Sequence, residues 1–102
     1  MQVKEFMLER MTVEEFAEKH GLIMEVHERS AEDSPDRFYA HFENSDITGD
    51  GVLIGAFGNG ATAQEAIKNY AEEISGKVLA IDAWTVLNRR NIPVPILVGH
   101  KP

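Results

Sequence analysis

Residues 62–76, with the sequence TAQEAIKNYAEEISG, decide the fold because they carry the start, the apolar stripe and the end of an amphipathic helix. Thr62 and Glu65 form a capping box, and Gly76 supplies the left-handed residue that commonly ends a helix. Apolar side chains recur between them at steps of three and four, at Ala63, Ala66, Ile67, Tyr70, Ala71 and Ile74. We therefore predict one long helix that packs this stripe against a sheet.

A shorter helix is predicted earlier in the chain by the same signals. Thr12 and Glu15 form another capping box, and Gly21 provides the terminating residue. The apolar residues between these signals keep a helical spacing, which places the helix at residues 13–20.

Between the two helices the apolar period changes to two. Residues 22–29 and 37–43 alternate apolar and polar side chains, and the polar, proline-containing stretch 30–36 separates them. This pattern predicts a hairpin of two half-buried strands. Its expected register places Val26 beside Ala40, so that the apolar faces of both strands coincide.

Further segments complete the predicted order. Residues 52–57 form a third strand after a turn-rich loop at 44–51, and the apolar run 78–81 is typical of a buried strand. Pro93 and Pro95, two positions apart, predict an edge strand or a tail at residues 91–102, because proline cannot donate within a central strand. Residues 1–11 form an ambiguous N-terminal segment.

The predicted fold class is α+β, in the order α-β-β-β-α-β(-β). We expect an antiparallel sheet of three to five strands with the long helix packed on one face. A chain of 102 residues is long enough for one core, so we expect a single domain over residues 1–102.

Composition restricts the functional classes. The chain has no cysteine, which excludes disulfides and thiolate chemistry and favours a reducing compartment. It has no apolar run of membrane-spanning length, so we expect a cytoplasmic protein, in the host cytosol if a phage encodes it. Its 17 acidic and 10 basic residues give a net charge of −7, which opposes direct nucleic-acid binding. This charge either suits a basic partner protein or serves only solubility.

A glycine-rich turn is the main hint of a cofactor. The turn at residues 58–62 matches a permissive dinucleotide fingerprint, and Asp82 follows the next apolar strand at a distance suited to holding a ribose. A phosphate-binding P-loop is excluded because Ala61 stands where its lysine belongs. The alternative is a tight turn without a ligand, and we expect no cofactor and no metal. A nucleotide site here would consist of Gly58, Gly60, Thr62 and Asp82.

Two surfaces carry residue types that are common at protein interfaces. His27 and His41 fall on the outer sheet face with Tyr39 and near Glu25, which suits a metal site, an acid–base pair or an ordinary polar face. The second surface is an aromatic and basic cluster after residue 82. No serine stands in a nucleophile-elbow context, so we do not expect an enzyme. The outer face is expected to hold Ile23, His27, Tyr39, His41 and Leu53. The binding residues are expected to be His27, Tyr39, His41, Trp84, Arg89 and Arg90.

Parts of the chain resemble known families. Residues 39–43, and residues 58–67 followed by Tyr70 and Ile74, resemble HicB-like antitoxins. In that family a strand, a G-x-T-x-x-E-A turn and a helix build a partial RNase H-like module, which implies masking of a small toxin ribonuclease. Residues 12–75 also resemble the layout of double-stranded-RNA-binding domains, although the second helix starts with Ala-Gln-Glu where that family has lysines.

The whole chain is also similar to small acidic proteins encoded by phages, which implies inhibition of host defence. Our leading hypothesis is therefore a non-catalytic inhibitor, of phage or prophage origin and homodimeric, that blocks a host defence protein. That partner is expected to be one that binds nucleic acid through a basic groove. An antitoxin that masks a ribonuclease, and a nucleotide-binding protein that uses residues 58–62, are the alternatives.

Overall fold

The computed structural model describes residues 1–2, 10–30, 35–85 and 87–98, which form two helices and nine short strands. Both helices occupy predicted segments. α1 (Val13–His20) begins with the capping box at Thr12 and ends at Gly21, which has a φ of 65°. α2 (Ala63–Ile74) begins at Thr62, whose hydroxyl accepts a 3.1 Å hydrogen bond from the amide three residues later. Local capping therefore sets where each helix starts.

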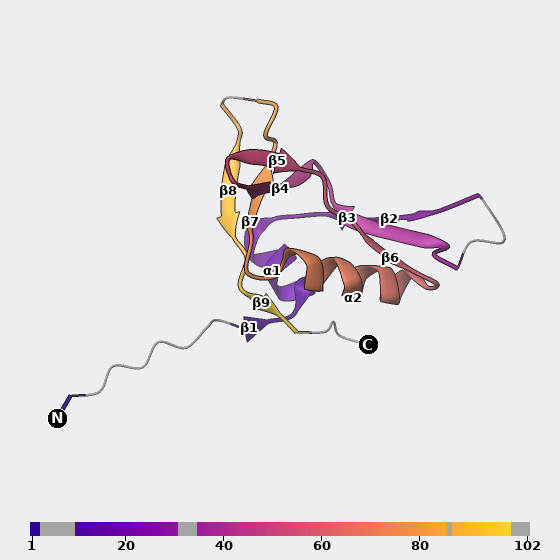
Figure 1. The fold of residues 1–102 in the computed structure, drawn as a ribbon, viewed down its shortest axis with the longest axis horizontal. Helices are drawn as coiled ribbons and strands as arrows, with labels where there is room; N and C mark the ends of the chain where they lie inside the picture. The colour runs from indigo at the N-terminus through magenta and orange to yellow at the C-terminus, as the bar shows by residue number, and fades with distance from the viewer. Residues whose placement is uncertain (3–9, 31–34, 86, 99–102) are drawn as a thin grey trace.

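The first sheet lies along α2 (Figure 1). It consists of β2 (Met24–Glu28), β3 (Phe38–Phe42) and β6 (Gly58–Gly60), which are antiparallel in the order β2-β3-β6. The predicted register of the first two strands is confirmed, with Val26 opposite Ala40. A strand does form within the predicted residues 52–57, at Val52–Ile54, but it belongs to the second sheet, and the glycine turn takes its place beside β3.

The second sheet has four antiparallel strands in the order β5-β4-β7-β8. They are β4 (Ser45–Gly49), β5 (Val52–Ile54), β7 (Val78–Ile81) and β8 (Arg90–Pro93). The prediction of a loop at residues 44–51 is wrong, because β4 pairs on both sides within this sheet. β8 lies at the edge of the sheet, where its proline costs no ladder hydrogen bond.

A third, two-stranded sheet joins the two ends of the described chain. β1 (Arg10–Met11) and β9 (Ile96–Leu97) pair in parallel. β1 lies in the N-terminal segment 1–11, whose structure was ambiguous from the sequence. β9 lies in the segment 91–102, which was predicted as an edge strand or a tail. The remaining parts of those segments, residues 3–9 and 99–102, lie outside the described residues.

One long hairpin runs through both larger sheets, since β3 leads into β4 and β5 leads into β6. It reverses at residues 50–51, where positive φ angles of 50° and 78° match a type I′ turn. Ala40 is paired with Gly58, and Ile47 is paired with Ile54. Between these two pairs the β3–β4 side of the hairpin advances seven positions, whereas the β5–β6 side advances only four. The surplus residues form a bulge at the corner between β3 and β4, where the hairpin bends from one sheet into the other.

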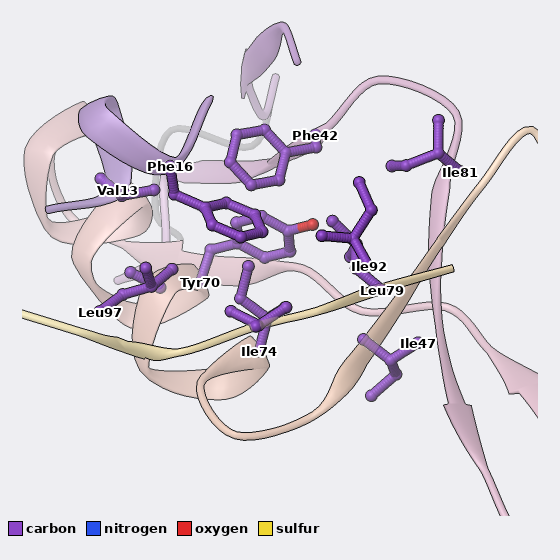
Figure 2. Close-up of a cluster of buried hydrophobic side chains, with 12 residues drawn as sticks. Val13, Phe16, Phe42, Ile47, Tyr70, Ile74, Leu79, Ile81, Ile92 and Leu97 are labelled. Atoms are coloured by element: carbon purple, nitrogen blue, oxygen red, sulfur yellow. The ribbon is translucent and has the colours of Figure 1, made fainter. Parts of the chain in front are cut away.

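The core lies where the helices meet both sheets (Figure 2). Phe42 is fully buried, and its ring centroid lies 6.1 Å from that of Phe16 and 5.5 Å from that of Tyr70. The Tyr70 hydroxyl lies 3.1 Å from Ser45 Oγ, which donates to the Phe42 carbonyl at 2.7 Å. These bonds tie α2 to the corner. The cluster also includes Val13, Ile47, Ala71, Ile74, Leu79, Ile81, Ile92, Val94 and Leu97.

The mixed α/β character and the antiparallel pairing are thus confirmed, but the predicted order is not. The single sheet with one helix on its face is replaced by three sheets, because the hairpin bends and delivers its two halves to different layers. Neither helix in the described ranges is long and apolar enough to cross a membrane.

Candidate functional site

A row of ring side chains crosses the outer face of the first sheet, on the side away from α2. Alternation along β3 turns Phe42 toward the helix, so its neighbours at odd positions point outward. The Tyr39 ring stacks on His27 with centroids 4.7 Å apart, and His27 stacks on His41 at 5.3 Å. Phe57, from the segment between β5 and β6, meets Tyr39 edge-on at 6.1 Å. We call Phe57, Tyr39, His27 and His41 the aromatic row.

Arg29 fixes the Tyr39 end of the aromatic row. Its guanidinium lies 4.8 Å from the Tyr39 ring centroid, a cation–π contact. It also donates to Asn59 Oδ1 and to the Asp36 carbonyl, each at 2.7 Å. Because Arg29 directly follows β2 and Asn59 belongs to β6, the Tyr39 ring of β3 is held by groups from both sides of its strand.

A hollow of about 480 Å³ lies at the other end of the aromatic row, at the corner between the two sheets. We call it the corner hollow. His41 lines it from the row, and Trp84, whose surface is 88% exposed, lines it from the segment after β7. Asp46 and Asp82 place two acidic residues in the lining of the same hollow. Its remaining lining residues are Asn44, Ser45 and Thr85.

A second hollow, of about 560 Å³, lies at the Tyr39 end. Phe57, with half of its surface exposed, lines it beside Tyr39 and Arg29. The aromatic row therefore connects two concave regions. The corner hollow is lined by two acidic residues, and the second hollow is lined by one acidic and one basic residue, Glu28 and Arg29.

The hydroxyl groups of the corner hollow are already engaged with the backbone. Ser45 Oγ donates to the Phe42 carbonyl at 2.7 Å, and Thr85 Oγ1 donates to the Asp82 carbonyl at 3.0 Å. His41 Nδ1 lies 2.9 Å from the same Phe42 carbonyl, so His41 is oriented by the backbone and not by Ser45. This geometry favours a binding surface over an activated nucleophile.

The predicted aromatic and basic cluster does not form as a unit. Arg90 donates to the His20 carbonyl at 3.0 Å, and Arg89 donates to Asn91 Oδ1 at 3.2 Å. The cation–π contacts found within the described ranges involve Tyr39 and Phe38, not Trp84. Trp84 and His41 instead line the same hollow, which therefore contains one residue from each of the two predicted surfaces.

The glycine turn that was predicted as an alternative nucleotide site packs directly against the backbone of α2. A Cβ atom added at Gly58 would lie 2.1 Å from the Tyr70 amide nitrogen, and one at Gly60 would lie 2.6 Å from the Ala66 nitrogen. These glycines allow β6 to approach the backbone of α2. The Thr62 hydroxyl caps that helix, and Asp82 lies beyond the opposite end of β3, where its amide donates to the Asn44 carbonyl. The structure does not bring the four predicted nucleotide residues together.

Leu53 and Ile23 were both predicted on the outer face of the first sheet. Leu53 lies in β5 opposite Thr48, and therefore belongs to the second sheet and not to the outer face of the first. Ile23 is 63% exposed just before β2. Asp46 and Phe57 were not predicted as site residues. The Asp-Gly turn at residues 50–51, a strong hairpin signal, could have placed the segments that carry them on the two sides of one hairpin.

Comparison of the chain with protein-family models, with curated proteins and with solved structures finds no match.

Proposed function

We propose that this protein is a non-catalytic binding protein that inhibits a partner protein by covering a basic surface of it. One observation carries this proposal: Asp46 and Asp82 share the corner hollow with the exposed indole of Trp84. An arginine or lysine side chain of a partner fits this combination, because it can pair with the carboxylates while its cationic end lies against the ring.

The aromatic row supplies the remainder of the interface. Rigid, half-exposed aromatic side chains contribute large contact area at low entropic cost and are enriched at binding hot spots. Phe57, at one end of the row, is 50% exposed, and Trp84, in the corner hollow beyond the His41 end, is 88% exposed. A net charge of −7 attracts a basic partner before contact and raises the rate of association.

Proteins that bind nucleic acid carry such basic surfaces, so a nucleic-acid-binding protein of the host is the partner class that we propose. Occupation of that surface by an acidic protein competes directly with the phosphate backbone. A toxin ribonuclease has the same surface chemistry, and the antitoxin alternative therefore predicts the same contacts. A gene for a small basic protein directly beside this one would favour the antitoxin.

The single tryptophan permits a direct test. We would titrate the full chain with short peptides of matched length, one rich in arginine, one rich in glutamate and one neutral, and follow Trp84 emission. The arginine peptide should change the emission saturably and the other two should not. The double variant Asp46→Asn/Asp82→Asn should weaken that binding by about tenfold or more, since two charge-assisted contacts are lost.

Asp50→Asn is the matched control. It removes one carboxylate at another residue of positive φ, at the hairpin turn and outside the lining of both hollows. Because the double variant removes two charges and the control one, a loss of binding free energy in Asp50→Asn at least half as large would reduce the effect to net charge and would contradict a specific hollow. An emission that does not respond to the arginine peptide would contradict the proposal itself.

A further inference from the structure

Three side chains with metal-binding atoms converge on the outer face of the first sheet. Glu25 and His27 are two positions apart on β2 and therefore project from the same side. His41 on β3 lies directly opposite Glu25 in the sheet register. One ligand atom from each of the three lies within 4.8 Å of the other two.

The individual distances resemble the edges of a metal coordination shell. Glu25 Oε2 lies 3.2 Å from His27 Nε2 and 3.7 Å from His41 Nε2. With metal–ligand bonds of about 2.0–2.1 Å, neighbouring ligand atoms of a tetrahedral zinc ion are about 3.3 Å apart. The His27 and His41 rings are within 17° of parallel, so both lone pairs reach one point only after ring rotation about the Cβ–Cγ bonds. That torsion is soft.

The hydrogen bond of His41 orients its ring toward the cluster. Its Nδ1 lies 2.9 Å from the Phe42 carbonyl, which can only accept, so Nδ1 is the donor in this bond and Nε2 is the ring atom on the side of Glu25. Hydrogen bonding of the second ring nitrogen to a backbone carbonyl is also how proteins orient histidines that bind metals.

We propose that Glu25, His27 and His41 bind one divalent transition-metal ion, with Zn²⁺ as the preferred ion. Two imidazoles and one carboxylate suit Zn²⁺ and its first-row neighbours, whereas Mg²⁺ and Ca²⁺ prefer oxygen ligands alone. The three side chains are partly exposed, at 37%, 41% and 27%, which leaves the ion accessible to solvent. The fourth position is therefore open to water or to a side chain of another molecule.

The test uses the full chain without a histidine tag, treated with a chelator and then dialysed. Calorimetric titration with ZnCl₂ should give one site per chain, and Co²⁺ should produce the visible absorption of a four-coordinate complex. The variants Glu25→Gln, His27→Gln and His41→Gln should each weaken Zn²⁺ binding by about tenfold or more, since each removes a direct ligand. Circular dichroism of each variant checks that the sheet still forms.

Glu28→Gln is the matched control, because Glu28 also lies on β2 but pairs with Arg37 and takes no part in the cluster. Its Zn²⁺ affinity should equal that of the wild type. Binding that survives in all three ligand variants, or the absence of binding at millimolar ZnCl₂, would overturn the proposal. No partner is needed for this experiment, so its result is independent of the proposed inhibitor function.

Discussion

The inner and outer faces of the first sheet are built from alternate residues of the same strands, yet they differ in kind. Beneath α2 the sheet presents Ala40 and Phe42 at 0% exposure and two glycines against the helix backbone, whereas Val26, on the same face of β2, is 39% exposed. Away from α2 it presents Tyr39, His27 and His41, which are half-buried and stacked. Packing against α2 explains the buried positions of the inner face. The outer face carries exposed aromatic area that the core does not require, and this difference is why we place function there.

The largest effect should come from the inner face, at Gly58. Gly58→Ala places a Cβ atom 2.1 Å from the Tyr70 amide nitrogen and 2.3 Å from the Ala66 carbonyl oxygen. Backbone atoms of a buried helix cannot yield, so we expect the free energy of unfolding in urea to fall by about 3 kcal/mol or more. Gly55→Ala is the control: the nearest atom to its added Cβ is Asp46 Oδ1 at 3.9 Å, and the cost should stay within about 0.5 kcal/mol. Equal losses in the two variants would contradict the close approach of β6 to α2.

The next effect should come from the hydroxyl of Tyr70. Since Ser45 Oγ donates to the Phe42 carbonyl, Tyr70 donates to Ser45, and Tyr70→Phe removes this buried bond. We expect a loss of about 1 kcal/mol in the free energy of unfolding at neutral pH. Denaturant titration of the two proteins side by side measures it.

The same residue should make stability depend on alkaline pH. Burial raises the pKa of the Tyr70 hydroxyl above its ordinary value of 10.0. The unfolded chain therefore releases this proton first, so the stabilisation is fully present below pH 10 and is lost as the pH rises through the folded-state pKa. Unfolding curves of the wild type and of Tyr70→Phe should converge above that range. A constant difference between them would indicate that Tyr70 does not titrate with folding.

The smallest effect should come from the outer face. Tyr39→Ala removes ring stacking and a cation–π contact at the surface, and we expect a loss of less than about 1 kcal/mol. Tyr70→Ala, at the other tyrosine of the chain, is the comparison and should cost about 3–5 kcal/mol. Similar losses for the two variants would mean that the aromatic row is part of the stabilising core, and the contrast between the faces would disappear.

The sequence predicted those parts of the structure that local signals determine. Caps at Thr12 and Thr62 located both helices, and alternation gave the register that brings His27 and His41 onto one face. The second sheet was missed because the Asp-Gly turn at residues 50–51 was interpreted as part of a loop, although it is a strong signal for a tight hairpin. The third strand of the first sheet, Gly-Asn-Gly, has no intrinsic strand preference and is imposed by pairing with β3 and by contact with α2.

Those residues of the candidate site that depend only on strand register could be predicted from the sequence. Tyr39, His27 and His41 follow from the strand register alone. The approach of Trp84 to His41 depends on the corner between two sheets, and a bend produced by surplus residues in one strand leaves no periodic pattern in the sequence. Asp46 was not predicted as a site residue because β4, the strand that carries it, was not expected.

The bulged corner of the long hairpin also determines where this molecule can change. Residues inserted or deleted there alter neither the β4–β5 pairing at the turn nor the β3–β6 pairing on α2, because both ladders are held by their own contacts. They would instead widen or narrow the space between His41 and Trp84. Variation in chain length at this single point would thus change the width of the corner hollow, and with it the side chain that the proposed interface could admit, while the scaffold stays the same.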